Sequence, residues 1–188
     1  MARTLIDGSG GLVNHVELVY WPGERGLVGE LFSTLGCKVV DTGGSFLIIH
    51  ADPETPDPHM LDNCLYASET TAEQWRFEEA LAGSLARDDE LRAAHAAFSG
   101  SSRARPQYTT HFGIRMSSPG RLDEVLDRVA AASRSRLAGR VEIAGVFRPG
   151  DTGSLSPILV QAFVRTDLCA AGFVSLGQYI ELQALSGR

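Results

Sequence analysis

One order of expected elements occurs twice along this chain of 188 residues: a strand, a helix and then three strands. The strands are recognised by alternation of apolar and polar side chains, and the helices by apolar residues that recur every three or four positions. A repeated unit of this kind indicates a duplicated architecture, so we predict an α+β fold of two βαβββ modules. The expected strands are residues 12–20, 37–41, 45–50, 63–70, 108–116, 140–147, 157–164 and 177–185.

The stretch between the two modules is larger than a simple connection requires. Residues 71–98 are rich in Ala, Glu, Arg and Leu and contain no proline, which favours two helices with a break near Gly83. The following stretch, 100–106, is predicted to be a linker. We therefore place the first module, the helical insertion and the linker in residues 1–106 and the second module in 107–188, together forming one structural domain.

Composition excludes several classes of function. A formal net charge of -6 argues against nucleic acid as a partner, because phosphate contacts need a clustered cationic surface. The three cysteines are odd in number and form no CxxC pair, so we expect neither a disulfide framework nor a thiolate zinc site, but a reduced, cytoplasmic setting. No apolar leader and no run of about 18 apolar residues occurs, so no membrane span or export is expected.

Three side chains in separate expected strands are candidate metal ligands. In the last strand, Tyr179, Glu181 and Gln183 share one face, and a carboxylate there must be solvated, paired or bound to a metal. His15 and His111 lie in the first strand of each module. Two imidazoles and one carboxylate are the ligand set of many non-haem iron sites.

These residues also carry a resemblance to a known group of proteins. Residues 12–70 and 107–185 resemble the vicinal oxygen chelate superfamily, which includes glyoxalase I, bleomycin-resistance proteins, methylmalonyl-CoA epimerase and extradiol ring-cleaving dioxygenases. The matching stretches are His15 with the apolar strand around it, Phe32-Ser33-Thr34-Leu35-Gly36-Cys37, His111-Phe112-Gly113-Ile114-Arg115 and Tyr179-Ile180-Glu181-Leu182.

The resemblance implies a cup-shaped, curved mixed sheet whose inner face holds a divalent metal at His15, His111 and Glu181. Fe(II) is the favoured ion, with Mn(II), Zn(II) and Ni(II) as alternatives. Family members with four ligands take another Glu or Gln from the fourth strand. This chain departs there, because the inward side of that strand offers Cys64, Tyr66 and Ser68, whereas Glu69 has the wrong parity.

Further side chains are candidates for catalysis and for binding a small-molecule substrate. Glu17 and His50 share strand faces with the expected inner side, and Tyr179 could donate to a substrate oxygen. A solvated glutamate is an equal alternative for Glu17, and a solvent-facing histidine and an aromatic wall are the plainer readings of His50 and Tyr179. Arginine and glutamine side chains would suit an anionic substrate, or else form structural ion pairs. The expected substrate-binding residues are Arg115, Gln161, Arg165, Phe163 and Tyr66.

Three functions remain open at the level of sequence. The first is an extradiol dioxygenase with Fe(II) at the triad. The second is a glyoxalase- or epimerase-like lyase or isomerase in which a carboxylate such as Glu17 moves a proton. The third is a metal-free binding or resistance protein. The helical insertion covers a sheet, closes the cup as a lid or serves as a dimerisation arm, and we expect a homodimer.

Overall fold

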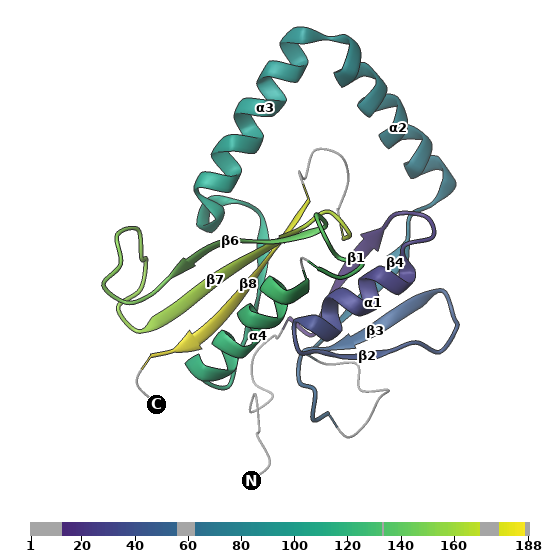
Figure 1. The fold of residues 1–188 in the computed structure, drawn as a ribbon. Helices are drawn as coiled ribbons and strands as arrows, with labels where there is room; N and C mark the ends of the chain where they lie inside the picture. The colour runs from purple at the N-terminus through teal and green to yellow at the C-terminus, as the bar shows by residue number, and fades with distance from the viewer. Residues whose placement is uncertain (1–12, 56–62, 133, 170–176, 187–188) are drawn as a thin grey trace.

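A computed structural model describes residues 13–55, 63–132, 134–169 and 177–186. Two modules lie side by side, and a pair of long helices projects beyond them as an arch (Figure 1). The first module comprises β1 His15–Tyr20, α1 Arg25–Thr34, β2 Lys38–Val40, β3 Phe46–His50 and β4 Cys64–Glu69. The second comprises β5 His111–Arg115, α4 Pro119–Ala132, β6 Val141–Phe147, β7 Leu159–Thr166 and β8 Gln178–Leu185.

Each module forms one four-stranded mixed sheet. The strand orders are β1-β4-β3-β2 and β5-β8-β7-β6, so the first strand of a module lies beside its last. That pair is parallel in both modules, and the other neighbours are antiparallel. The same order in both sheets confirms the predicted α+β fold of two βαβββ modules.

The helices α1 and α4 determine which face of each sheet is the core. Leu18 and Tyr20 of β1 are buried with Leu31 of α1, and Ile180 and Leu182 of β8 belong to the same continuous apolar cluster. Because side chains alternate along a strand, the intervening residues turn away from these helices. We call that opposite side of each sheet its inner face.

Polar contacts join the modules on the helix side. Arg128 of α4 donates from Nε to the carbonyl oxygen of Thr34 at the end of α1, 2.9 Å away. Arg140 pairs with Glu24 of the first module and with Asp167 of the second, both at 2.8 Å. These two carboxylates hold the pKa of the Arg140 guanidinium above its ordinary value. The modules are therefore tied together by side chains of α4 and its neighbouring loops as well as by the core.

The insertion differs from its prediction in where the helix breaks. It forms α2, Ala72–Arg87, and α3, Asp89–Ala104, followed by a short 3₁₀ helix at Pro106–Tyr108. Gly83 lies inside α2, and the break falls at Asp88, whose carboxylate accepts a hydrogen bond from the amide of Leu91. An aspartate cap at the start of a helix stabilises it by about 1 kcal/mol, which is comparable with the cost of a glycine inside one.

The predicted linker at residues 100–106 is also wrong, because most of it is the last turn of α3. Ser102 in that turn is buried and donates a hydrogen bond to the hydroxyl of Tyr179 in β8. This long-range contact favours the helix where glycine and serine alone would not. Within the described ranges, no helix has both the length and the apolar character needed to cross a membrane.

Candidate functional site

The inner face of the second sheet brings two of the predicted ligands together. β5 and β8 are parallel neighbours with Gly113 opposite Glu181, so His111 lies on the same face and within reach of the carboxylate. His111 Nε2 is 3.3 Å from Glu181 Oε2, and only 6% of the Glu181 side chain is exposed. A buried carboxylate thus lies directly beside an imidazole, as the predicted ligand set requires of these two residues.

The contact of the other ring nitrogen of His111 indicates which nitrogen carries the imidazole proton. His111 Nδ1 is 2.6 Å from the carbonyl oxygen of Thr109. A carbonyl oxygen only accepts, so Nδ1 carries a proton, and in the neutral imidazole Nε2 then presents a lone pair. Two lone pairs face each other when Glu181 is ionised. A cation placed between Nε2 and Oε2 would be bound by both lone pairs.

Gln161 of β7 completes the polar surroundings of the carboxylate. Its Nε2 donates to Glu181 Oε1 at 2.5 Å. Its own Oε1 is buried and has no hydrogen-bond partner among the described residues. Buried amide oxygens normally have a partner, so this atom marks a position where a ligand, a water or an ion would be accommodated.

Aromatic rings and a glycine shape the space around the pair. Phe163 is fully buried with its ring 5.3 Å from that of His111, and Phe147 lies 6.0 Å from Phe163. On β5, a Cβ placed on Gly113 would be 3.4 Å from Glu181 Oε2. The glycine therefore leaves free a space beside this oxygen that any other side chain would occupy.

These residues fit a divalent cation. Two ligand atoms that each lie about 2.1 Å from one ion, at a tetrahedral angle, are about 3.4 Å apart, close to the separation of His111 Nε2 and Glu181 Oε2. A ligand histidine usually donates its other N–H to a carbonyl or carboxylate, as His111 does to Thr109. In the described part of the chain, however, no three His, Cys, Asp or Glu side chains are close enough to hold a metal ion.

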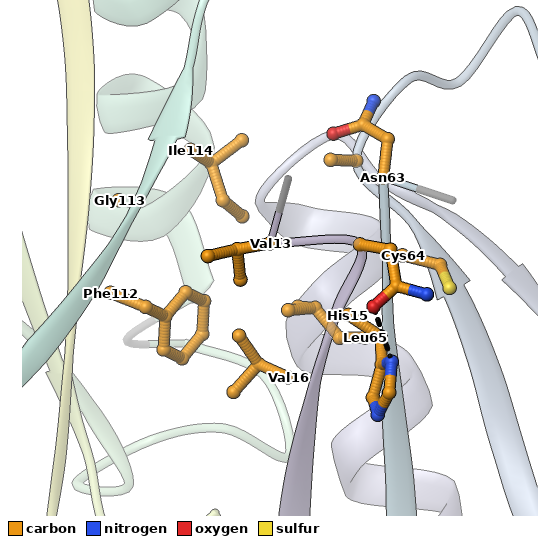
Figure 2. Close-up of a pocket in the computed structure, with 11 residues that line it drawn as sticks. Val13, His15, Val16, Asn63, Cys64, Leu65, Phe112, Gly113 and Ile114 are labelled. Carbon is orange, nitrogen blue, oxygen red and sulfur yellow. Dashed lines mark hydrogen bonds between the residues drawn. The ribbon is translucent and has the colours of Figure 1, made fainter. Parts of the chain in front are cut away.

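His15 lies on the other module. It is exposed, its Nδ1 is 2.9 Å from Asn14 Oδ1, and its ring packs edge-on against Tyr66 at 5.4 Å. Between β1 and β5 is a cleft of about 270 Å³, and in Figure 2 Val13 and Val16 of its lining lie between Phe112 and the His15 ring. The predicted triad stays a prediction. His111 and Glu181 are adjacent in the second module, whereas His15 lies in the first module, across this cleft from β5.

The other candidates of the first module lie on β1, β3 and β4. Glu17 accepts a hydrogen bond of 2.7 Å from Ser68 Oγ of β4, and Tyr66 lies between the rings of His15 and Phe46. His50 is fully buried in β3, so the reading of it as a solvent-facing histidine is wrong. Cys64, Tyr66 and Ser68 lie opposite the core residues Leu65 and Ala67 of β4, as their parity predicted. Glu17, Tyr66 and Ser68 form a polar and aromatic surface on the inner face of the first sheet, whereas Cys64 is buried.

The remaining predicted residues lie on the inner face of the second sheet. Arg115 of β5 donates to Gln183 Oε1 at 2.9 Å, and Arg165 of β7 is 3.3 Å from Glu142. Tyr179 is fully buried, and its hydroxyl accepts from Ser102 at 3.1 Å. Arg115 is the one of these side chains that is exposed, on the strand that carries His111.

Three residues of the site were not singled out from the sequence. Thr109 contributes through its backbone, for which no sequence signal exists. Phe147 reaches the site through the register of β6, where Phe147 lies opposite Gln161. Gly113 had a signal, because a glycine between two polar residues on one strand face often marks a close approach of other atoms.

Comparisons with known proteins give likeness in fold at low sequence identity. A hypothetical protein from S. aureus is 10% identical, with 93% of this chain and 95% of that chain covered and a TM-score of 0.45. The oxidase ChaP-H2 is 10% identical, with coverages of 93% and 94% and a TM-score of 0.42. A glyoxalase family protein from Bacillus cereus is 14% identical, with coverages of 96% and 99% and a TM-score of 0.42. No protein-family model and no curated protein matches the sequence. The two-module fold is therefore assigned from the strand order of the chain itself.

Proposed function

We propose that this chain is a metal-dependent enzyme of the vicinal oxygen chelate type that acts on a small, oxygen-bearing organic substrate. The observation that supports this best is the contact between His111 Nε2 and Glu181 Oε2 at 3.3 Å, where the tautomer fixed by Thr109 leaves no proton between the two atoms. A divalent cation would accept both lone pairs and would be bound by the buried Glu181 carboxylate and the half-buried His111 imidazole.

The chain's own residues have separate roles in this proposal. His111 and Glu181 hold the cation, Fe(II) or one of Mn(II), Zn(II) and Ni(II), and His15 is the third ligand that the resemblance implies. When bound, the ion polarises substrate oxygens as a Lewis acid and, as Fe(II), supplies redox chemistry. Gln161 holds the Glu181 carboxylate in position, and Phe147 and Phe163 limit the access of water.

In this proposal Arg115 favours the binding of anionic substrates. Its guanidinium is exposed on the inner face and bonded to the neutral amide of Gln183. Gly113 lies between it and His111 on β5, so no side chain fills the strand position between the cation site and the arginine. A substrate that places oxygens near Glu181 and a carboxylate near Arg115 would span two strand positions, about 7 Å.

The reaction class follows from which further residue participates. A ring-cleaving dioxygenase needs three protein ligands and therefore His15, and it consumes dioxygen. A lyase or isomerase needs a base, for which Glu17, hydrogen-bonded to Ser68, is the candidate, and it turns over without dioxygen. Oxygen uptake with catechols, compared with anaerobic turnover of 2-oxoaldehyde adducts or 2-acyl thioesters, separates the two.

A metal-free binding protein is the second candidate, and a specific observation favours it. The Gln161 amide already satisfies Glu181 Oε1, and a single added proton would convert the His111–Glu181 contact into an ion pair. In that case the site needs no cation, and the aromatic residues of the inner faces provide the contacts to an apolar ligand.

Metal binding tests the proposal directly. The protein is reconstituted anaerobically with Fe(II), Mn(II) or Zn(II), and bound metal is measured by elemental analysis and titration calorimetry. We expect one equivalent, with His111→Ala and Glu181→Gln each lowering the affinity by about 100-fold or more, whereas His95→Ala, a histidine on α3, leaves it unchanged. A wild-type protein that retains no divalent ion would contradict the proposal and leave the binding protein as the better reading.

A further inference from the structure

The end of the projecting arch of α2 and α3 is built into the inner face of the second sheet. Ser102, the one buried residue of α3, donates from Oγ to the hydroxyl of Tyr179 in β8 at 3.1 Å. Pro106 of the 3₁₀ helix is also buried, and a Cβ added to Gly145 of β6 would lie 3.8 Å from its Cγ. We call residues 102–109, where α3 comes down to the second module, the arch end (Figure 1).

Thr109 is bound to the arch end by its side chain. Its Oγ1 is 3.2 Å from Ser102 Oγ and 3.4 Å from the carbonyl oxygens of both Ser102 and Arg105. Its amide donates to the carbonyl oxygen of Pro106 at 3.1 Å. A hydroxyl has one proton to donate, so these acceptors share it, and together they hold the threonine against the last turn of α3. The position of Thr109 is therefore determined by where α3 ends.

The carbonyl group of Thr109 connects the arch end to the candidate site. Its oxygen is 2.6 Å from His111 Nδ1, while Nε2 of the same ring faces Glu181 Oε2 at 3.3 Å. His111 is also opposite Tyr179 in the β5–β8 register, so both sides of the arch-end contact lie beside this imidazole. A carbonyl that moved away from Nδ1 would leave the ring free to rotate and its proton free to change nitrogen.

We propose that Thr109 and Ser102 are positioning residues, whose hydroxyls hold the arch end so that the Thr109 carbonyl keeps a proton on His111 Nδ1 and directs Nε2 toward Glu181. The inserted helices then serve the site, because the β5–β8 pairing fixes the backbone of His111 but not the orientation of its ring. This inference rests on the proposed function only for its effect on metal affinity, since the contact between His111 and Thr109 is a hydrogen bond between protein atoms.

A purely structural role for these hydroxyls gives different expectations. If they only stabilise the end of α3, Thr109→Val and Tyr179→Phe should act alike, because each removes one hydroxyl that contacts the arch end. If they position the imidazole, Thr109→Val should change His111, and Tyr179→Phe should change it much less, because the contact of Tyr179 with Ser102 does not include Thr109. The state of the His111 ring therefore distinguishes the two roles, whereas protein stability does not.

Nuclear magnetic resonance of the full chain with ¹⁵N-labelled histidine measures that state, and His111→Gln identifies the signals. In the wild type we expect the Nδ1 shift of a protonated nitrogen and slow exchange of its proton with water. Thr109→Val keeps the carbonyl but removes the hydroxyl, and should speed this exchange by about fivefold, the effect of a hydrogen bond of ordinary strength. Ser102→Ala should have a smaller effect, because the carbonyl oxygens of residues 102 and 105 remain as acceptors.

Two matched variants separate the hydroxyl from other effects of the substitution. Thr110→Val makes the same change at the next residue, which is exposed, and should leave the exchange of the His111 proton as in the wild type. Thr109→Ser restores the hydroxyl and should restore the slow exchange. Circular dichroism and urea denaturation establish that each variant keeps its helices and its cooperative unfolding.

Zinc titration of the same proteins separates this inference from the proposed function. We expect Thr109→Val to lower the affinity for Zn(II) by about threefold or more, as for other changes behind a ligand histidine, and Thr110→Val to leave it unchanged. A wild type with a protected Nδ1 proton that binds no metal refutes the proposed function but not the positioning. Exchange that is equal in Thr109→Val and Thr110→Val, or a wild-type His111 protonated on Nε2 alone, overturns the positioning, and so does unchanged zinc affinity in Thr109→Val.

Discussion

Replacing Gly113 by alanine tests whether the space beside Glu181 is used for binding, because the replacement should change metal affinity without destabilising the fold. The added Cβ would lie 3.4 Å from Glu181 Oε2 and 3.7 Å from the Glu181 carbonyl oxygen, which are ordinary contact distances. Gly113 is also absent from the described glycines with positive φ, so alanine adopts its backbone conformation without strain. We therefore expect the free energy of unfolding to stay constant or to rise by roughly 0.4–1 kcal/mol, because alanine restricts the unfolded chain.

The same methyl group occupies the space beside the oxygen that faces His111. A cation or substrate atom that uses this space must be displaced, and we expect the affinity for Zn(II) or Mn(II) to fall by about 10-fold or more, as for other changes next to a metal ligand. Urea denaturation measures stability and titration calorimetry measures metal affinity in the same preparation. A variant that is at least as stable as wild type but binds metal weakly would establish that the gap is functional.

Gly100→Ala in α3 is the matched control, because a Cβ added there would have no atom within 4 Å. It should raise stability by up to about 1 kcal/mol through helix propensity and leave metal affinity unchanged. If Gly113→Ala binds metal as tightly as this control, then nothing enters the space beside Glu181 Oε2, and the reasoning about the site is refuted.

Three other predictions concern the structure around the site. Gly177→Ala should lower the free energy of unfolding by roughly 2–4 kcal/mol in chemical denaturation, because φ is 90° and a Cβ would be 2.5 Å from the carbonyl oxygen of Thr166. Burial raises the pKa of the Cys37 and Cys169 thiols to about 12. Their stabilising contribution is complete below the pKa of about 9 of an exposed thiol and is lost as pH rises toward 12, so denaturation should be easier at about pH 10.5 than at about pH 8, and native alkylation of both should be slow by mass spectrometry. Tyr179→Phe should cost about 1 kcal/mol through its lost hydrogen bond and leave metal affinity unaltered, which calorimetry would check.

Strand parity is the part of the site that could be predicted from the sequence. Tyr179, Glu181 and Gln183 were placed on one face because side chains alternate, and Ile180 and Leu182 indeed belong to the core. The same rule excluded Glu69 from the inner face of β4. Its carboxylate instead accepts a hydrogen bond from the amide of Gly23. Parity is a local property of the backbone, so it needs no knowledge of distant contacts.

Contacts between residues far apart in the sequence determine the features that could not be predicted, namely the end of α3 and the tautomer of His111. Ser102 extends α3 through a stretch that reads as a linker, because it meets Tyr179, which lies 77 positions further along the chain. Thr109 fixes the tautomer of His111 with a backbone carbonyl, an atom that every residue type has. Neither effect leaves a trace in local composition, and both depend on where the second sheet places its neighbours.

Contacts between distant segments also explain why His111 lies beside Glu181 whereas His15 lies on the other module. β5 and β8 belong to one sheet, where backbone hydrogen bonds fix the register Gly113 to Glu181 and therefore bring His111 to the carboxylate. β1 belongs to the other sheet, and in the described residues no strand pairing joins the two sheets. The distance from His15 to Glu181 is instead determined by side-chain packing of α1, α4 and the residues of the β1–β5 cleft, which tolerates shifts that a hydrogen-bonded register does not. A site built on this fold thus has one precise half in the second module and one adjustable half in the first.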